Sequence, residues 1–176
     1  MRLMCCVDTN AVLDICYRYY ANDSFKSLWE GLESAVIADQ VRFIQSEHIN
    51  KEILVKLIQF NYPKNNYDDF VSRLKVDIIK SSDYAQAQLN LKSDLATNIP
   101  SIANKPVSFL DNLDEDLSNI SVASIRNAKV ITSEQGFNKD ITKTKNPRLK
   151  IPDVCHYKNI SCSNWLEVFR HLGMKF

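Results

Sequence analysis

Short apolar runs alternate with amphipathic stretches along this chain. Four of the runs have the length of buried strands, and they cover residues 3–7, 41–44, 129–132 and 160–162. Between the runs, apolar side chains recur at helical spacing, as Phe25, Leu28 and Leu32 do. This spacing predicts helices over residues 10–20, 24–38, 47–60, 67–79, 82–97 and 115–127, with shorter helices opening at 151 and following 163.

Polar segments separate these elements. Residues 61–66 predict a break in the chain, and residues 98–108 predict a loop. The helix over 82–97 is rich in Gln, Asn and Lys, which predicts an exposed helix. Ser46 and Ser163 each precede a helix and are expected to cap it, because a serine hydroxyl can accept a hydrogen bond from the first helical turn.

Strands that are separated by helices favour a mainly parallel sheet with helices on both faces. We therefore expect an α/β fold, a three-layer α/β/α sandwich with a short, mainly parallel central sheet of four or five strands. The 176 residues predict one domain over residues 1–176, which is long enough to bury a core without disulfides.

Composition excludes several classes of protein. The formal net charge of +1 predicts no global attraction to nucleic acid, and only three glycines leave no room for a glycine-rich phosphate loop. The five cysteines show no C-x-x-C spacing, which predicts free thiols in a reducing compartment. Neither a signal peptide nor a membrane-spanning run is recognisable, so we expect a cytoplasmic protein without a membrane partner.

The sequence Asp8-Thr9-Asn10 directly follows the first apolar run. Open α/β sheets place ligand sites at the carboxyl ends of their strands, where Asp8 is expected. A carboxylate that leaves a buried strand is costly without a compensating cation. The alternative is that Asp8 only caps the next helix.

Three further acids occur in similar settings, and each has a structural alternative. Glu52 lies at the flank of the apolar face of its helix, or pairs with Lys56 at i,i+4. Asp116 shares a helical face with apolar residues, or serves as an N-terminal acid favoured by the helix dipole. Glu134 follows the run 129–132, or caps the next turn.

Taken together, two strand-end acids and two helix-flank acids predict one pocket at the carboxyl edge of the sheet. Four carboxylates that converge repel one another, and a divalent cation relieves the repulsion. Oxygen donors alone favour Mg²⁺ or Mn²⁺ over zinc, and the three histidines show no zinc-binding spacing. The candidate catalytic residues are therefore Asp8, Glu52, Asp116 and Glu134.

These pieces resemble the PIN-domain family of metal-dependent ribonucleases. The matching segments are 6–10, 49–53, 116–123 and 130–134, while residues 61–112 match loosely. The segments 150–155 and 173–176 are similar to an uncharacterised prokaryotic branch of PIN-like proteins related to VapC-type toxins. Two features depart from the family pattern: the helix after Asp116 is more polar than usual, and the last acid is Glu134 where Asp is commoner.

The resemblance implies a Mg²⁺- or Mn²⁺-dependent endoribonuclease that cleaves RNA phosphodiester bonds, and it extends to the toxin of a toxin–antitoxin pair. It implies metal binding by Asp8, Asp116 and Glu134, with Glu52 as a further catalytic acid. The implied supporting polar residues are Thr9, Asn10 and Ser133. The implied partners are RNA, a small antitoxin protein and a second copy of the chain.

Two alternatives remain open from the sequence. One is a catalytically inactive PIN-like module that binds nucleic acid or protein, and the other is a structural protein whose acids are caps and surface pairs. Residues 136–150 carry five Lys or Arg and predict a mobile loop. This loop is either simply solvated or holds RNA phosphates near the acidic pocket.

Overall fold

The computed structural model describes residues 2–103, 105–106, 108–136, 140–143 and 148–174. Its centre is a sheet of five strands, all parallel, in the order β3-β2-β1-β4-β5. The strands are β1 (Leu3–Val7), β2 (Val41–Ser46), β3 (Asp77–Ile79), β4 (Lys129–Ile131) and β5 (Cys162–Ser163). The predicted α/β class and parallel central sheet are therefore confirmed.

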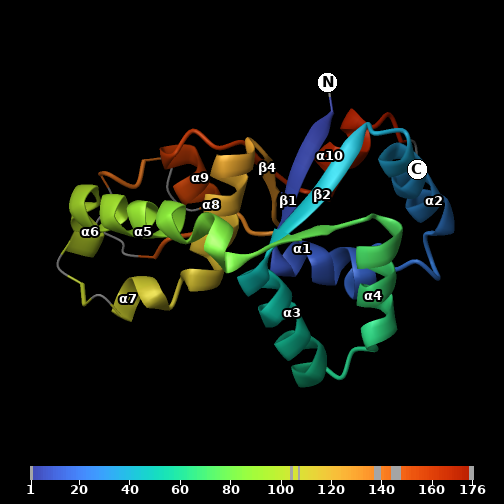
Figure 1. The fold of residues 1–176 in the computed structure, drawn as a ribbon, viewed down its shortest axis with the longest axis horizontal. Helices are drawn as coiled ribbons and strands as arrows, with labels where there is room; N and C mark the ends of the chain where they lie inside the picture. The colour runs from blue at the N-terminus through green and yellow to red at the C-terminus, as the bar shows by residue number, and fades with distance from the viewer. Residues whose placement is uncertain (1, 104, 107, 137–139, 144–147, 175–176) are drawn as a thin grey trace.

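Helices connect the strands and cover both faces of the sheet (Figure 1). The N-terminal half contains α1 (Thr9–Leu13), the π-helical turn η1 (Asp14–Arg18), α2 (Lys26–Ile37), α3 (Glu47–Gln59) and α4 (Lys64–Arg73). The remainder contains α5 (Ser81–Asn98), α6 (Pro100–Ala103), α7 (Ser108–Asp111), α8 (Asp114–Arg126), α9 (Ile151–Tyr157) and α10 (Trp165–His171).

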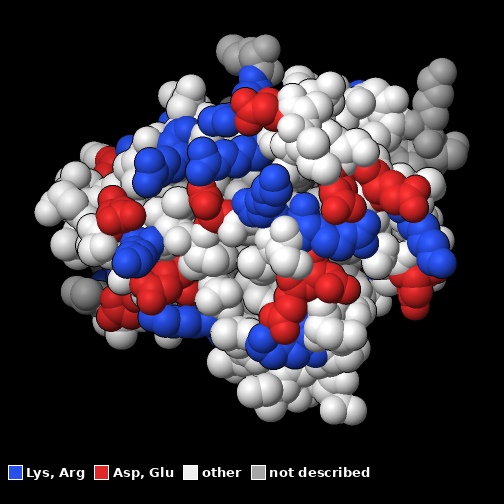
Figure 2. Space-filling view, turned by 45° about the vertical axis from the view of Figure 1, so that its right-hand side comes forward, with Lys and Arg blue, Asp and Glu red and all other residues white. Residues whose placement is uncertain are grey.

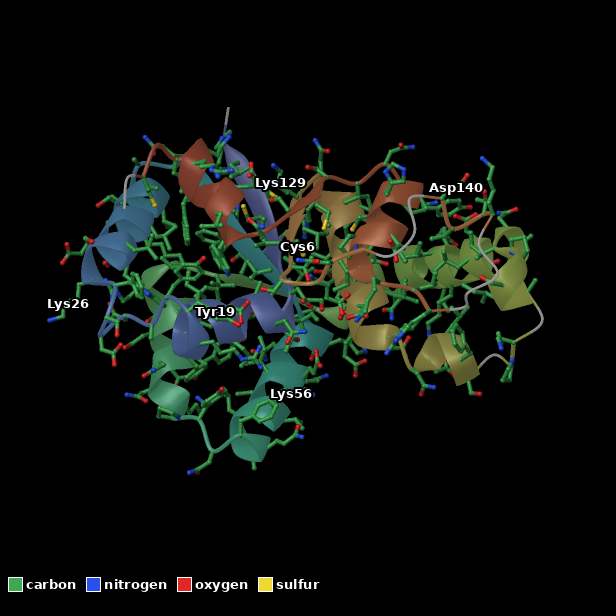
Figure 3. All side chains as sticks on the ribbon, turned by 180° about the vertical axis from the view of Figure 1, so that it is seen from behind. Cys6, Tyr19, Lys26, Lys56, Lys129 and Asp140 are labelled. Atoms are coloured by element: carbon green, nitrogen blue, oxygen red, sulfur yellow. The ribbon has the colours of Figure 1, made fainter. Side chains whose placement is uncertain are left out.

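Two hydrophobic cores lie on opposite faces of the sheet because successive strand side chains point to opposite sides. Cys5 and Phe43 belong to the core that α1, α2, α3, α4 and α10 cover. Cys6 and Ile44 belong to the core that α5, α8 and α9 cover. Cys6 is labelled on β1 in Figure 3, and its thiol donates a hydrogen bond to Asn119 Oδ1 of α8 at 3.0 Å.

The structure corrects several predicted elements. The helix predicted over 67–79 ends at Arg73, and Asp77–Ile79 forms the edge strand β3, which pairs with β2. Three strand residues are too few to show a period that distinguishes a strand from a helix end. The predicted loop over 98–108 contains α6 and the start of α7, and the predicted break at 61–66 already contains the start of α4.

Two other predictions differ in detail. The helix predicted as exposed, α5, buries Tyr84, Gln88, Leu91 and Leu95 despite its polar sequence. The cap of α10 is Asn164, whose side chain accepts a hydrogen bond from Glu167 N, while the predicted cap Ser163 belongs to β5.

No described helix combines the length and apolar composition that crossing a bilayer requires. All five cysteines are free, as predicted.

Candidate active site

Two of the predicted acids leave neighbouring strands at the same edge of the sheet. Asp8 follows β1 and Glu134 lies three residues after β4, and these two strands pair in parallel with Val7 opposite Ile131. The backbone N–H of Asp8 continues this ladder by donating to Ile131 O at 2.9 Å. The carboxyl ends of parallel strands coincide, so the two acids reach a common edge.

Asp8 is an acid buried in the fold rather than a helix cap. Only 2% of the residue is exposed, and Thr132 Oγ1 donates to its Oδ2 at 3.0 Å. Asp8 occupies the N-cap position of α1, yet its side chain makes no capping hydrogen bond. Thr132 in turn accepts from Glu134 N at 3.1 Å, so one hydroxyl links the two strand ends.

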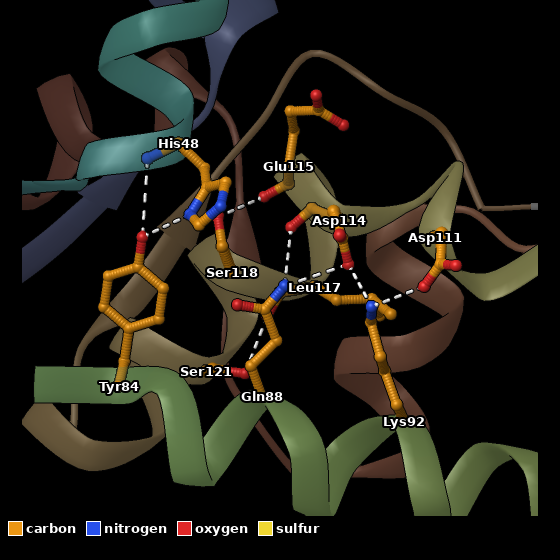
Figure 4. Close-up of polar contacts among 10 residues, drawn as sticks. All are labelled: His48, Tyr84, Gln88, Lys92, Asp111, Asp114, Glu115, Leu117, Ser118 and Ser121. Atoms are coloured by element: carbon orange, nitrogen blue, oxygen red, sulfur yellow. Dashed lines mark hydrogen bonds and ion pairs between the residues drawn. The ribbon is translucent and has the colours of Figure 1, made fainter. Parts of the chain in front are cut away.

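Asp116 lies in the first turn of α8, and the contacts of Asp114 fix the orientation of that turn. Gln88 of α5 donates to Asp114 Oδ1 at 3.1 Å, and Lys92 forms an ion pair with Asp114 and with Asp111 (Figure 4). These contacts tie one side of the first turn of α8 to α5. Asp116 lies on another side and is close enough to Glu134 and Glu52 for their charges to act on it.

Serine hydroxyls join α8 to β2 and α3. Ser118 Oγ lies 2.7 Å from Ser46 Oγ and also donates to Glu115 O at 2.6 Å. Ser46 caps α3, as predicted, by accepting from Ile49 N at 3.1 Å. The hydrogen bond between Ser118 and Ser46 therefore links α8 to the capped start of α3. These two helices carry Asp116 and Glu52, respectively.

We expect Ser46→Ala to lower the free energy of unfolding by about 1 kcal/mol, because α3 loses its side-chain cap. Urea denaturation followed by circular dichroism measures this loss. Ser72→Ala is the matched control, since the Ser72 hydroxyl bonds to Asp69 O on the exposed surface of α4 and caps no helix. Equal stability of wild type and Ser46→Ala would contradict the role of this cap.

Glu52 points back toward the end of β1. Thr9, the first residue of α1, donates a short hydrogen bond to Glu52 Oε2. The alternative partner, Lys56, instead places its Nζ 5.9 Å from the centre of the Phe60 ring. The half-buried Glu52 is thus held beside Asp8 by its neighbour Thr9.

Glu134 is held by two groups at the start of α9. Lys150 Nζ forms an ion pair with its Oε1, and the backbone N–H of Ile151 donates to its Oε2 at 3.1 Å. Among the described residues, the partners of the Glu134 carboxylate therefore lie at the start of α9, whereas the structural alternative predicts a partner in the turn after β4.

The charges of the four acids act on one another. Burial, followed by the charge of Asp116, raises the pKa of Asp8 to about 8, and Glu134 adds to this effect. Burial, followed by the charges of Glu134 and Glu52, raises the pKa of Asp116 to about 7, against the opposing effect of Lys150. Asp116 is therefore within electrostatic reach of the other three acids, and Asp8 is within reach of Asp116 and Glu134, so simultaneous ionisation of Asp8 and Asp116 is disfavoured.

The three residues expected to support the acids differ in their contacts and in their exposure. Thr9 contacts Glu52, while Asn10 is exposed at the start of α1. Ser133 donates a short hydrogen bond to Asp14 Oδ2, which is a buried acid of η1. Asp14 also accepts from Arg18 at 3.4 Å. The π-helical turn thus brings the Asp14 carboxylate into contact with Ser133, which lies between β4 and Glu134.

Sequence patterns place Lys150 in the basic segment 136–150, for which contact with RNA phosphates is one alternative, and they give no role in the site to Asp14. Asp153 is buried, and a side chain at Gly136 would lie 2.7 Å from its Oδ1, so only glycine fits at this position without a shift. Residues 137–139 and 144–147 of the basic loop lie outside the described residues.

The donor set suits a hard divalent cation. Asp8 and Asp116 offer carboxylate oxygens with raised pKa values, so their negative charge is not fully compensated by the protein. Among the residues that the structure describes, no three His, Cys, Asp or Glu side chains already form a group that could hold a metal ion. Glu52 and Glu134 are instead bonded to Thr9 and Lys150.

Comparison with known protein families shows that residues 5–176 match a family model. The matching family is described as a domain of unknown function, DUF4411. Comparison with curated proteins and with solved structures gives no match.

Proposed function

We propose that this chain, which belongs to the DUF4411 family, is a Mg²⁺- or Mn²⁺-dependent endoribonuclease of the PIN-like kind. One observation carries the proposal. Two carboxyl groups with strongly raised pKa values, Asp8 and Asp116, lie with Glu52 and Glu134 at the carboxyl edge of a parallel sheet. Perturbed acids that converge in such a place are typical of catalytic sites.

Asp8 and Asp116 are the residues that would hold the cation. When bound, a divalent cation lowers the pKa of water and offsets negative charge on a phosphodiester. Oxygen ligands are those that Mg²⁺ and Mn²⁺ prefer. Thr132 fixes the Oδ2 atom of Asp8, so this ligand is oriented before any ion binds.

The remaining groups act on water and on substrate. Thr9 orients Glu52 beside the end of β1, which supports a role for this carboxylate as the group that would accept a proton from the attacking water. Glu134 is held by Lys150 and by the N-terminus of α9, which gives that side of the cluster a positive component. Attack by water in line with the leaving oxygen would cleave the phosphodiester bond.

RNA as the substrate rests on the resemblance and on local charge. Figure 2 shows Lys and Arg interspersed with Asp and Glu over one face of the molecule, in keeping with the net charge of +1. Contacts to RNA phosphates must therefore come from local groups. Lys150 lies in the cluster itself, and Arg148 and Lys143 precede it in the predicted basic segment.

The direct test is incubation of a mixed-sequence RNA with the purified chain. We expect cleavage with Mn²⁺ or Mg²⁺, no cleavage with EDTA, and recovery when Mn²⁺ is added in excess over EDTA, as resolved on denaturing gels. Cleavage that persists in EDTA would contradict the mechanism. RNA that is bound but stays intact with Mn²⁺ would favour the alternative function, an inactive binding module.

A finer assignment, the toxin of a toxin–antitoxin pair, is part of the same proposal and rests on the resemblance to VapC-type toxins. A small gene for a DNA-binding antitoxin, directly upstream of the gene for this chain, would support it. Co-expression provides the functional check. Growth arrest by the chain alone, and rescue by the upstream product, would establish the pair.

A further inference from the structure

The acidic cluster contains a positive charge of its own. Lys150 Nζ lies against Glu134 Oε1, and the two side chains are only 30% and 16% exposed. Ile151 N holds the other oxygen of Glu134 at 3.1 Å. Both carboxylate oxygens of Glu134 therefore already have a donor at the start of α9.

Lys150 also lies close to Asp116. Both residues line the same small pocket between α8 and the start of α9, together with Leu113, Leu117 and Leu149. The ammonium charge lowers the pKa of Asp116, against the larger effects of burial and of Glu134. Lys150 thus pairs with Glu134 and lines the same pocket as Asp116, one of the two acids that would hold the cation.

We propose that the Lys150 ammonium takes the place of a second divalent cation at Glu134, so that the cluster binds a single Mg²⁺ or Mn²⁺ at Asp8 and Asp116. This inference rests on the proposed function, because it concerns the same cation site. Charge supports it. Four carboxylates are nearly balanced by one ammonium and one divalent cation, whereas a second divalent cation would lie against the ammonium and be repelled.

The backbone at the start of α9 also holds the Glu134 carboxylate in place. Lys150 is the N-cap residue of α9, and its neighbour Ile151 donates to the same carboxylate. The ion pair with Lys150 and this backbone bond hold the carboxylate of Glu134 in the absence of any metal. An ion bound to Glu134 would have to share this carboxylate with the Lys150 ammonium, whose charge repels it.

Titration of the metal-free chain of 176 residues with MnCl₂ by isothermal calorimetry tests the inference. We expect about one Mn²⁺ per chain for wild type and about two for Lys150→Gln, because Glu134 is then released as a ligand. Lys150→Arg keeps the charge and should retain the wild-type stoichiometry. Lys64→Gln is the matched control, since it removes an exposed lysine that pairs with Asp68 on α4.

A second measurement does not depend on the variants. Electron paramagnetic resonance of wild type saturated with Mn²⁺ should show isolated ions without exchange coupling. Two bound or coupled ions in wild type, or a single ion in folded Lys150→Gln, would overturn the role of Lys150 and leave the proposed function standing. Absence of Mn²⁺ binding by wild type would overturn the proposed function, and this inference with it.

Discussion

Replacing Asp8 or Asp116 with asparagine is expected to lower the rate of RNA cleavage by roughly a thousandfold or more. The physical reason is that a catalytic cation contributes several kcal/mol to transition-state stabilisation, and each ~1.4 kcal/mol is a factor of ten in rate. Neutral asparagine cannot replace the charge of either proposed ligand. It does keep an oxygen that can accept the Thr132 hydrogen bond now made to Asp8, so folding should be preserved.

Asp114→Asn provides the matched control for this experiment. Asp114 lies in the same helical turn as Asp116, but it contacts Gln88 and Lys92 of α5 (Figure 4). Asparagine keeps the Oδ1 atom that Gln88 and Lys92 contact, so the turn should stay in place and cleavage should remain within about twofold of wild type. Comparable losses in Asp114→Asn and Asp116→Asn would mean that α8 is merely being destabilised.

The second large effect concerns stability. In EDTA, we expect wild type to become less stable as pH rises from about 4 to about 8, and Asp8→Asn to lose much of this dependence. The folded-state pKa values of Asp8 and Asp116, about 8 and about 7, lie above the value near 4 of an unfolded chain. The folded protein therefore retains protons in this interval that the unfolded chain has released.

The sign follows from proton binding. The favourable contribution of each carboxyl group is complete below its unfolded pKa and is lost as pH rises through its folded pKa, with a slope of at most ~1.4 kcal/mol per pH unit per group. At pH 8 without metal, Asp8→Asn should exceed wild type in stability by ~1–3 kcal/mol, which is several degrees in melting temperature. A helix cap would show the opposite change, a loss of ~1 kcal/mol on mutation.

Mn²⁺ should reverse the order of the two proteins. Binding to the folded state alone adds ~4.1 kcal/mol at a concentration of about 1,000 times Kd, which exceeds the expected ~1–3 kcal/mol advantage of Asp8→Asn. We expect this gain in wild type and not in Asp8→Asn, measured as melting temperature at pH 8 with EDTA and with MnCl₂. Asp69→Asn, an exposed acid on α4, should respond as wild type does. Indifference of wild type to both pH and Mn²⁺ would contradict the site.

Some features of this protein follow from the sequence alone. Apolar runs separated by amphipathic stretches predict a parallel sheet with helices on both faces. The reason is that two parallel strands need a crossover connection, which is usually a helix that packs on the sheet. The place of Asp8 and Glu134 after such runs also puts both at the carboxyl edge, whatever the strand order. The cap Ser46 is equally local, since it depends on a residue three positions away.

The tertiary structure decided the rest, because the deciding contacts join distant residues. The strand order puts β1 beside β4, and only then can Thr132 reach Asp8 across 124 positions. The π-helical turn that brings Asp14 to Ser133 has no signature in hydrophobic spacing, because it changes hydrogen-bond register and not composition. The ion pair of Lys150 with Glu134, and the raised pKa values of Asp8 and Asp116, depend on distance and burial, which exist only in the folded chain.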